Sequence, residues 1–298
     1  MRIWLTGGNG QVGYELRRSL ALLGEVQAPG RDACDLQDPD AIRRAVREWQ
    51  PDVIVNPAAY TAVDKAESDS AGAEAVNVRA PAVLAEEAER LGAMLVHFST
   101  DYVFDGTQTQ PYTEDDTTNP QGVYGATKLA GEVAVQAACS RHLILRTSWV
   151  VGAHGGNFLK TMLRLAGQRA SLNVVADQTG APTSADLLAD LTALLVREAS
   201  RAPTAFPYGL YHATAAGATT WHAYAQHVVA RAAKAGRALA AGPQDIHPIS
   251  TDQYPTPARR PANSQLDTGK LSRTFGLRLP SWQDGVDRVL DHVLRNPS

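Results

Sequence analysis

The chain has 298 residues, of which 44% are hydrophobic and 20% are charged. This balance supports a sizeable folded core and excludes disorder of the whole chain. The formal net charge of -3 gives no basic signature for nucleic acid or an anionic membrane, so we expect neither as a partner. No apolar run reaches the roughly 18 residues of a membrane span, and no signal-peptide pattern precedes residues 3–5. We therefore expect a cytoplasmic protein.

The chain has two cysteines, Cys34 and Cys139. Two cysteines in a chain of this length do not make a disulfide framework. Neither lies in a C-x-x-C motif or a Cys/His array, which argues against structural zinc. We expect two reduced thiols in or near the core.

The first half of the chain alternates short apolar runs with segments of helical character. Residues 3–6, 52–56, 94–99 and 143–147 read as buried parallel strands. Helices are expected between them, over residues 13–23, 40–49, 71–91 and 124–138. This alternation predicts an α/β fold with a Rossmann-like, doubly wound parallel sheet, whose ligands bind at the carboxyl ends of the strands.

The pattern loosens after about residue 149. Residues 152–157 form a glycine-rich loop, and five prolines lie between residues 243 and 261. Helices are expected over residues 224–241 and 282–294. We therefore expect a dinucleotide-binding Rossmann core over residues 1–150 and a smaller, interleaved substrate-binding lobe mainly over residues 151–298.

A glycine-rich turn joins the first expected strand to the first expected helix. Residues 8–13 satisfy G-x-G-x-x-G, and Gly7, Gly10 and Gly13 satisfy G-x-x-G-x-x-G. Glycines allow a tight turn, let backbone N–H groups approach a pyrophosphate and let the helix pack close to the sheet. The strand before the turn and the helix after it favour a dinucleotide site over a turn without a ligand.

The residues after the second strand bear on the choice of cofactor. That strand should end near residues 28–31, where an acidic residue holds the ribose of NAD and an arginine accommodates the 2′-phosphate of NADP. Arg31 and Asp32 stand side by side there. We interpret Arg31 as favouring NADPH, while NADH and a plain pair of surface charges both stay open.

Tyr124 and Lys128 are four residues apart on one expected helix, so they share a face. A phenol with its ordinary pKa of ~10 is a poor proton-transfer group at neutral pH. A nearby ammonium would lower that pKa toward the working range. Thr100 follows the preceding strand and could donate to a substrate carbonyl oxygen. Together with the glycine turn, these residues predict hydride transfer between a nicotinamide and a carbonyl carbon.

With these motifs, the chain resembles the extended short-chain dehydrogenase/reductase superfamily and, within it, the dTDP-4-dehydrorhamnose reductases. The glycine and Tyr/Lys motifs are shared across the superfamily, whereas residues 101–106, Trp149 and residues 260–267 are specific to the reductases. The similar segments are residues 6–13, 52–59, 64–67, 99–106, 123–132, 145–149, 177–183 and 260–267.

The resemblance implies that NADPH or NADH reduces the 4-keto group of dTDP-4-dehydro-L-rhamnose, giving dTDP-L-rhamnose. Tyr124 would protonate the oxygen at C4, with Lys128 and Thr100 as the other catalytic residues. Beyond the glycines, Tyr124, Lys128 and Arg31, the implied cofactor contacts are Gln11, Val12, Asp35, Leu36, Ala59, Tyr60 and Thr61. The implied substrate contacts are Thr100, Asp101 and Trp149, and Arg260 is a candidate for the substrate diphosphate.

Some members of this family form a homodimer around Mg²⁺, and Glu15 and Asp186 occupy the matching positions. Each residue is equally consistent with an ordinary acidic side chain on the surface of a helix, with no role in metal binding. Two other functions stay open. One is reduction or epimerisation of another nucleotide-linked 4-keto sugar. The other is a non-catalytic binding subunit of the same fold, which need not keep Thr100, Tyr124 and Lys128.

Overall fold

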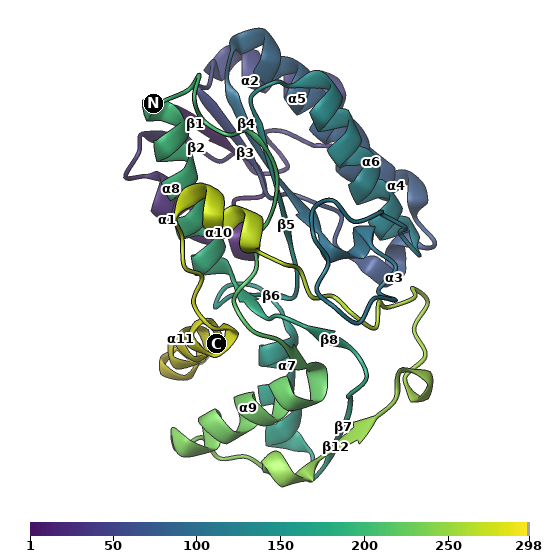
Figure 1. The fold of residues 1–298 in the computed structure, drawn as a ribbon. Helices are drawn as coiled ribbons and strands as arrows, with labels where there is room; N and C mark the ends of the chain where they lie inside the picture. The colour runs from purple at the N-terminus through teal and green to yellow at the C-terminus, as the bar shows by residue number, and fades with distance from the viewer. Residues whose placement is uncertain (297–298) are drawn as a thin grey trace.

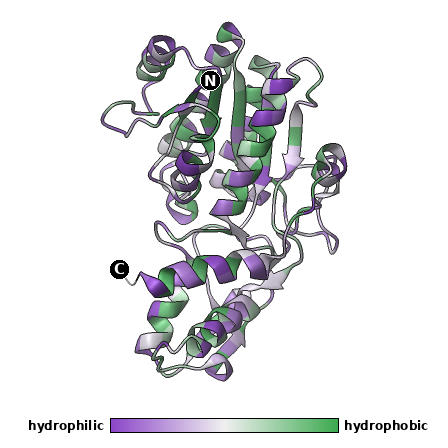
Figure 2. Ribbon diagram, turned by 90° about the vertical axis from the view of Figure 1, so that its left-hand side faces the viewer, coloured by the Kyte–Doolittle hydropathy of each residue, from purple (hydrophilic) through white to green (hydrophobic). Residues whose placement is uncertain are grey.

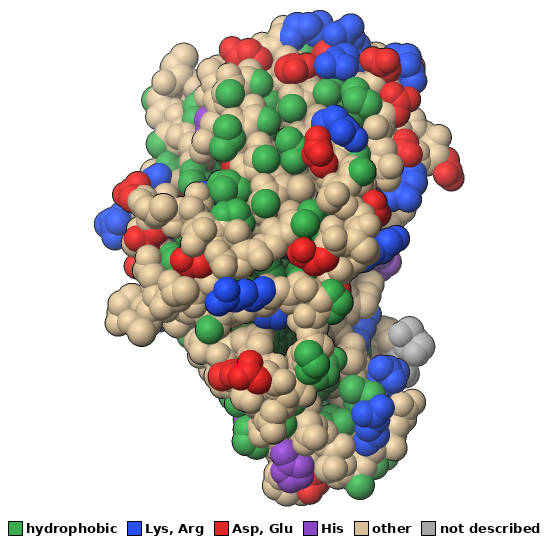
Figure 3. Space-filling view, turned by 90° about the vertical axis from the view of Figure 1, so that its right-hand side faces the viewer, with side chains coloured by type: hydrophobic (Ala, Val, Ile, Leu, Met, Phe, Trp, Pro, Cys, Tyr) green, Lys and Arg blue, Asp and Glu red, His purple; other side chains and the backbone are tan. Residues whose placement is uncertain are grey.

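The computed structural model describes residues 1–296, so the last two residues of the expected 151–298 lobe lie outside the described residues. Figure 1 shows a sheet with helices on both faces in its upper part and a smaller group of elements below. On the face seen in Figure 3, acidic and basic side chains lie on the surface of both parts. No helix within residues 1–296 is long and apolar enough to cross a membrane.

The central sheet has six strands in the order β10-β5-β4-β3-β1-β2, and every pair of neighbours is parallel. Its strands are β1 (Arg2–Leu5), β2 (Glu25–Gln27), β3 (Val53–Asn56), β4 (Met94–Thr100), β5 (His142–Thr147) and β10 (Gly209–His212). β2 and β3 pair on opposite sides of β1, which places the switch point of the sheet between β1 and β3. The predicted doubly wound fold is confirmed.

Side chains that alternate along the strands build a core on each face of the sheet. Ile3 and Leu5 pack on one face with α1 (Gln11–Leu20), α8 (Ala185–Arg201) and α10 (Gly269–Phe275). Trp4 packs on the other face with α2 (Pro39–Trp49), α5 (Ala80–Leu91) and α6 (Val123–Ala138). The strands between these layers are hydrophobic along most of their length, as Figure 2 shows. Two buried, free thiols, Cys34 and Cys139, confirm the prediction for the cysteines.

The connection from β3 to β4 departs from the single helix expected over residues 71–91. It contains α3 (Val63–Ala66), α4 (Ser70–Glu74), a π-helical turn η1 (Ala75–Arg79) and then α5. Pro81 has no N–H to donate to the carbonyl of Asn77, so the regular α-helical bonding is interrupted there. A Cβ on Gly131 of α6 would lie 2.1 Å from that same carbonyl oxygen, so glycine lets α6 pack against the π turn.

The smaller lobe is the group of elements α7 (Phe158–Gln168), β7 (Leu172–Val175), α9 (Trp221–Lys234), β12 (Ile246–Ile249) and α11 (Trp282–Arg295). It has its own apolar core, which includes Leu159, Val228 and Trp282. The remaining short elements are η2 (Asp101–Val103), β6 (Val150–Val151), β8 (Thr179–Gly180), β9 (Thr183–Ser184), β11 (Thr219–Thr220), η3 (Pro243–Asp245) and η4 (Thr251–Gln253).

Several expected element ends were wrong. The helix expected over residues 13–23 runs from Gln11 to Leu20. The helix expected over residues 224–241 begins at Trp221 and ends at Lys234, because Gly236 adopts φ +83° and stops it. The second strand ends at Gln27, slightly before the expected residues 28–31. The loop that carries Arg31 therefore begins earlier, at the carboxyl edge of the sheet.

Candidate active site

Two adjoining cavities lie at the carboxyl ends of the strands and share four lining residues, Gly7, Gly10, Ala58 and Ala59. The first, of about 250 Å³, lies beside the loop after β2. The second, of about 560 Å³, extends past the ends of β4 and β5 toward α6. Together they make one elongated cleft across the switch point of the sheet, where ligands bind in this class of fold.

The glycine turn between β1 and α1 forms the shared part of the cleft. Gly7 adopts φ +57°, and a Cβ on Gly13 would lie 2.0 Å from the carbonyl oxygen of Gly7. Gly10 donates its N–H to that oxygen at 2.9 Å and begins α1 without a side-chain cap. The first N–H groups of α1 are thus left without a capping side chain, an arrangement that suits a pyrophosphate. These residues fit the dinucleotide that the sequence predicts.

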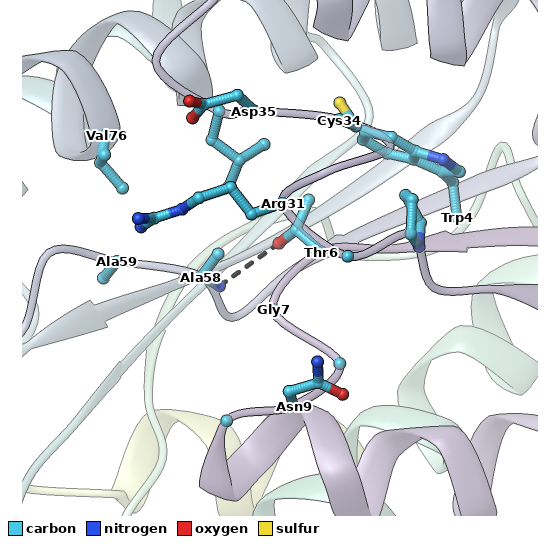
Figure 4. Close-up of a pocket in the computed structure, with 15 residues that line it drawn as sticks. Trp4, Thr6, Gly7, Asn9, Arg31, Cys34, Asp35, Ala58, Ala59 and Val76 are labelled. Atoms are coloured by element: carbon cyan, nitrogen blue, oxygen red, sulfur yellow. Dashed lines mark hydrogen bonds between the residues drawn. The ribbon is translucent and has the colours of Figure 1, made fainter.

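The first cavity is lined by three of the residues expected at the adenosine end of the cofactor, Arg31, Asp35 and Leu36. Trp4 and Cys34 form part of its wall. Figure 4 shows the Arg31 side chain extending across this cavity toward Val76.

The second cavity brings together residues that are far apart in the sequence. Thr100 ends β4, Tyr124 and Lys128 lie in the first turns of α6, and Trp149 follows β5. The other expected residues that line it are Gly7, Gly10, Gln11, Val12, Gly13, Ala59, Thr61 and Asp101. The predicted proton-transfer residues therefore share one cavity with most of the predicted cofactor contacts.

The pKa of Tyr124 is raised above its usual value, which corrects the expectation that Lys128 would lower it. Burial is the main cause, and the negative charge of Asp101 adds to it, whereas a hydrogen bond with Thr100 acts in the opposite direction. The phenol therefore stays protonated at neutral pH. It is held in the form that donates a proton.

Lys128 is buried beneath the cavity and directs its amine at β4. Its Nζ donates to the carbonyl oxygen of Phe98 at 2.6 Å and lies 3.3 Å from Nε2 of His97. Burial lowers the pKa of Lys128 to about 8, although the negative charge of Glu132 opposes that shift. The amine can therefore exchange a proton near physiological pH.

Asp101 is a buried carboxyl group at the edge of the same cavity. Thr100 donates its hydroxyl to Oδ1 of Asp101 at 3.0 Å, whereas Oδ2 is buried and has no hydrogen-bond partner among the described residues. Burial raises the pKa of Asp101 to about 6, although the hydrogen bond from Thr100 acts to lower it. An unpartnered, buried oxygen in a cavity wall suits a hydroxyl group of a ligand.

Trp149 forms the wall of the cavity next to the smaller lobe. Its φ of +46° is rare for a residue with a large side chain. The indole stacks on Trp221 with ring centroids 3.6 Å apart, and a Cβ on Gly180 would lie 2.5 Å from it. The stack and the absence of a side chain at residue 180 hold Trp149 in this strained conformation.

Two of the expected cofactor and substrate contacts do not line either cavity. Tyr60 donates its hydroxyl to Asp69 at 2.9 Å. Arg260 forms an ion pair with Asp64 at 2.7 Å and donates to the hydroxyl of Tyr102 at 3.2 Å. Because Tyr102 does line the second cavity, Arg260 lies behind the cavity wall.

Glu15 and Asp186 lie together in a separate surface cavity, but each has a cationic partner. Glu15 pairs with Arg18 at 3.4 Å, and Asp186 pairs with Arg288 at 3.1 Å. Within residues 1–296, no group of three or more His, Cys, Asp or Glu side chains could hold a metal ion. The donor set of a single chain therefore does not fit Mg²⁺.

Sequence reasoning missed one role of an expected residue and one residue of the site altogether. Gln11 was expected only as a cofactor contact, but its Oε1 accepts hydrogen bonds from Gly152 N at 2.8 Å and from Asn157 Nδ2 at 2.9 Å. It thereby links the glycine turn to the loop before α7. Trp221 was missed as well, because its stacking partner Trp149 is 72 positions away in the sequence.

Comparison with known proteins places this site in a family. The family model described as "RmlD substrate binding domain" matches residues 1–295. A relative from Burkholderia thailandensis, a dTDP-4-dehydrorhamnose reductase, is 51% identical over 298 residues, which cover 99% of each chain.

Solved structures agree with this match. The crystal structure of a dTDP-4-dehydrorhamnose reductase from Clostridium acetobutylicum has a TM-score of 0.89 and 36% identity, covering 98% of this chain and 99% of that one. A dTDP-4-dehydrorhamnose reductase from Bacillus anthracis, solved in complex with NADP, has a TM-score of 0.86 and 32% identity over 97% of this chain and 98% of that one. The chain therefore belongs to the RmlD substrate binding domain family, and its reductase relatives match it along nearly their whole length.

Proposed function

We propose that this chain reduces the 4-keto group of dTDP-4-dehydro-L-rhamnose to give dTDP-L-rhamnose, with NADPH as the cofactor. The observation that carries this proposal is the single cavity that Thr100, Tyr124 and Lys128 share with the glycine turn. The names of its full-length relatives support the substrate, and the NADP complex of the Bacillus anthracis reductase supports the cofactor.

In this mechanism, Thr100, Tyr124 and Lys128 each perform one part of the reaction. When bound, the reduced nicotinamide supplies the hydride that the sugar carbon C4 receives. Tyr124, protonated because it is buried, donates its proton to the oxygen at C4. Thr100 turns its hydroxyl from Oδ1 of Asp101 to the same oxygen, donates a hydrogen bond to it and orients the carbonyl. Lys128, whose pKa is about 8, returns a proton toward Tyr124.

Trp149 and Asp101 are the proposed substrate contacts. The indole of Trp149 offers an apolar face to the deoxysugar, and the free Oδ2 of Asp101 accepts from a sugar hydroxyl. For the diphosphate we propose Arg260, which would have to exchange part of its pairing with Asp64 for phosphate oxygens. Its bond to Tyr102 keeps the guanidinium next to the cavity wall.

Arg31 is the proposed selector of NADPH over NADH. The side chain of Arg31 crosses the first cavity. Within residues 1–296, Arg31 forms no ion pair with Asp35. A guanidinium in that position suits the 2′-phosphate.

The proposed function is tested by mixing the purified chain with dTDP-4-dehydro-L-rhamnose and following the loss of NADPH absorbance. We expect one NADPH to be oxidised for each dTDP-L-rhamnose formed. Tyr124→Phe is the control for catalysis by this site. Binding of NADPH without oxidation would instead favour another keto sugar or a non-catalytic subunit.

A homodimer joined by Mg²⁺ stays a proposal that rests on the family resemblance. The ion would have to displace Arg288 from Asp186 and Arg18 from Glu15, and a second chain would have to supply further oxygens. Sedimentation velocity in Mg²⁺ and in EDTA tests this. A dimer that dissociates in EDTA would support the metal, and a monomer in both buffers would contradict both parts of the proposal.

A further inference from the structure

A continuous chain of buried polar groups runs through the central sheet to Lys128. It starts at Thr6, directly after β1, passes Asn56 at the end of β3 and His97 within β4, and ends at Lys128 on α6. Each of the four residues is at most 2% exposed. Burying polar groups costs free energy unless they are hydrogen-bonded, so four of them across an apolar sheet require an explanation.

The backbone of Ala58 sets the direction of this chain. Thr6 Oγ1 accepts from the N–H of Ala58 at 3.3 Å and donates to Oδ1 of Asn56 at 2.6 Å. Asn56 Nδ2 then donates to Nδ1 of His97 at 3.0 Å. The Thr6 hydroxyl has no other hydrogen-bond partner within residues 1–296, so its proton is satisfied only when Asn56 turns Oδ1 toward it. The bond from the Ala58 N–H to Thr6, which Figure 4 marks, thus orients all the bonds that follow it.

The orientation of Asn56 determines which ring nitrogen of His97 carries a proton. Burial, and then the charge of Lys128, hold the pKa of His97 well below its usual value, so the ring is neutral and has one N–H. Because Nδ1 accepts from Asn56, the proton lies on Nε2, the nitrogen that is 3.3 Å from Lys128 Nζ. An ammonium has no lone pair to accept that N–H, whereas a neutral amine has one.

We propose that Asn56 and His97 are positioning residues, which hold an imidazole N–H against Lys128 and so make its ammonium release a proton more readily. The inference rests on the proposed function in one respect only: Lys128 must exchange protons beside Tyr124 during turnover. Thr6 directly follows β1 and Asn56 ends β3, the two strands at the switch point of the sheet. Strand pairing therefore fixes the first residues of this series of hydrogen bonds, and its last residue, Lys128, reaches the reacting site.

Several other groups act on the same amine. Glu132 lies one turn further along α6 and favours the ammonium. Its charge is shared with Arg146 of β5, to which it is bound at 2.6 Å. The titratable or charged groups around Lys128 are His97 on β4, Tyr124 and Glu132 on α6, Arg146 on β5, and Asp101 at the start of η2.

The direct test is nitrogen-15 NMR of the full chain labelled at histidine, which distinguishes a protonated ring nitrogen from an unprotonated one. The signals of His97 are identified by their loss in His97→Gln. At neutral pH we expect a proton on Nε2 and none on Nδ1. A proton on Nδ1 would overturn the proposal. No turnover is needed, so this result does not depend on the substrate.

A kinetic test uses Thr6→Val, which keeps the shape of the side chain and removes the hydroxyl proton that orients Asn56. The amide is then free to turn, and His97 can accept a hydrogen bond from the ammonium. We expect the alkaline limb of kcat/KM to move to higher pH by roughly half a unit to one unit.

The matched control is Thr192→Val, which removes a buried hydroxyl of α8 that donates to the carbonyl of Leu188 at 2.7 Å. It should leave the alkaline limb in place. If the alkaline limb of kcat/KM stays in place or moves to lower pH in Thr6→Val, the result would contradict the role of the hydrogen bonds that run from Thr6 to Lys128. If the wild-type protein binds NADPH but turns over no substrate, the proposed function fails, while the NMR result still decides this inference.

Discussion

Burial acts in opposite directions on the two proton-handling residues of the site. It raises the pKa of Tyr124 and lowers that of Lys128 to about 8, because each group favours its neutral form away from water. The spacing of the two residues could be recognised in the sequence. Their burial could not, because the cavity walls come from residues as distant as Phe98 and Trp149.

Replacing Tyr124 with Phe removes the proposed proton donor and keeps the ring. We expect kcat to fall by about two to four orders of magnitude, the usual scale for a positioned acid. The dissociation constant of NADPH, measured by fluorescence titration, should hardly change. Near-wild-type turnover in this variant would remove Tyr124 from the mechanism.

Loss of Lys128 charge should set the alkaline limit of activity. The amine has a lowered pKa in the folded chain, so it is an ammonium below about pH 8 and a neutral amine above it. We expect kcat/KM to fall as the pH rises through about 8, because the ammonium supplies the returning proton. A kcat/KM that stays flat to pH 10 would show that the charge of Lys128 is not needed.

Arg31→Ala tests the choice of cofactor. The variant should lose affinity for NADPH by roughly tenfold, the scale of one charge-assisted hydrogen bond, and keep its affinity for NADH. The measurement is the ratio of the two KM values. Arg169→Ala, at an exposed position after α7, is the control and should leave the ratio unchanged. An unchanged ratio in Arg31→Ala would contradict the selector role.

Among the elements, the β1–turn–α1 unit depends most closely on its exact residues. Its strand, glycine spacing and helix could all be predicted, because each has a local signal in the sequence. The π turn η1 could not, although Pro81 carries the physical reason for it. The strand β10 was also missed, since four residues with little apolar periodicity acquire a role only by pairing with β5.

Gly13→Ala should disrupt this unit. The added Cβ would meet the carbonyl oxygen of Gly7 at 2.0 Å, so the turn must open. We expect NADPH affinity to fall at least tenfold, together with a lower Tm in thermal unfolding.

Gly167→Ala on α7 is the matched control, because no atom lies within 4 Å of its added Cβ. Alanine there should stabilise the helix by up to about 1 kcal/mol. Equal NADPH affinity in the two variants would contradict this account of the turn.

For the molecule as a whole, the sequence indicated the fold class and the cleft better than the arrangement of the second half. Apolar runs and helical periodicity are local properties, and they were enough to predict four of the six strands of the central sheet, while a fifth, β2, was expected after the glycine turn. The partners of Trp149 and Lys128 depend on contacts between distant segments. Asn56 and His97 sit in otherwise apolar strands, and only the pairing of those strands brings them together.

The buried ion pair between Arg146 and Glu132 ties the sheet to α6 across the core. Their side chains are 4% and 2% exposed, and the hydroxyl of Ser99 also donates to Glu132. Glu132→Gln leaves the charge of Arg146 buried and uncompensated, so we expect a loss of roughly 3–5 kcal/mol in the free energy of unfolding. Urea denaturation measures it. Glu86→Gln, which breaks the exposed pair with Arg43, should cost less than about 1 kcal/mol. Similar losses in both variants would contradict the role of burial.

The two hydrogen bonds that Gln11 accepts from the loop before α7 have a thermodynamic consequence. We expect a cofactor seated on the glycine turn to restrict Gln11, and Gln11 in turn to restrict a loop that contributes Gly155 and Gly156 to the reacting cavity. Linkage is reciprocal: if the cofactor raises the affinity for the sugar nucleotide by some factor, the sugar nucleotide raises the affinity for the cofactor by the same factor. We therefore expect the two ligands to bind cooperatively through this one amide side chain, whichever of them binds first.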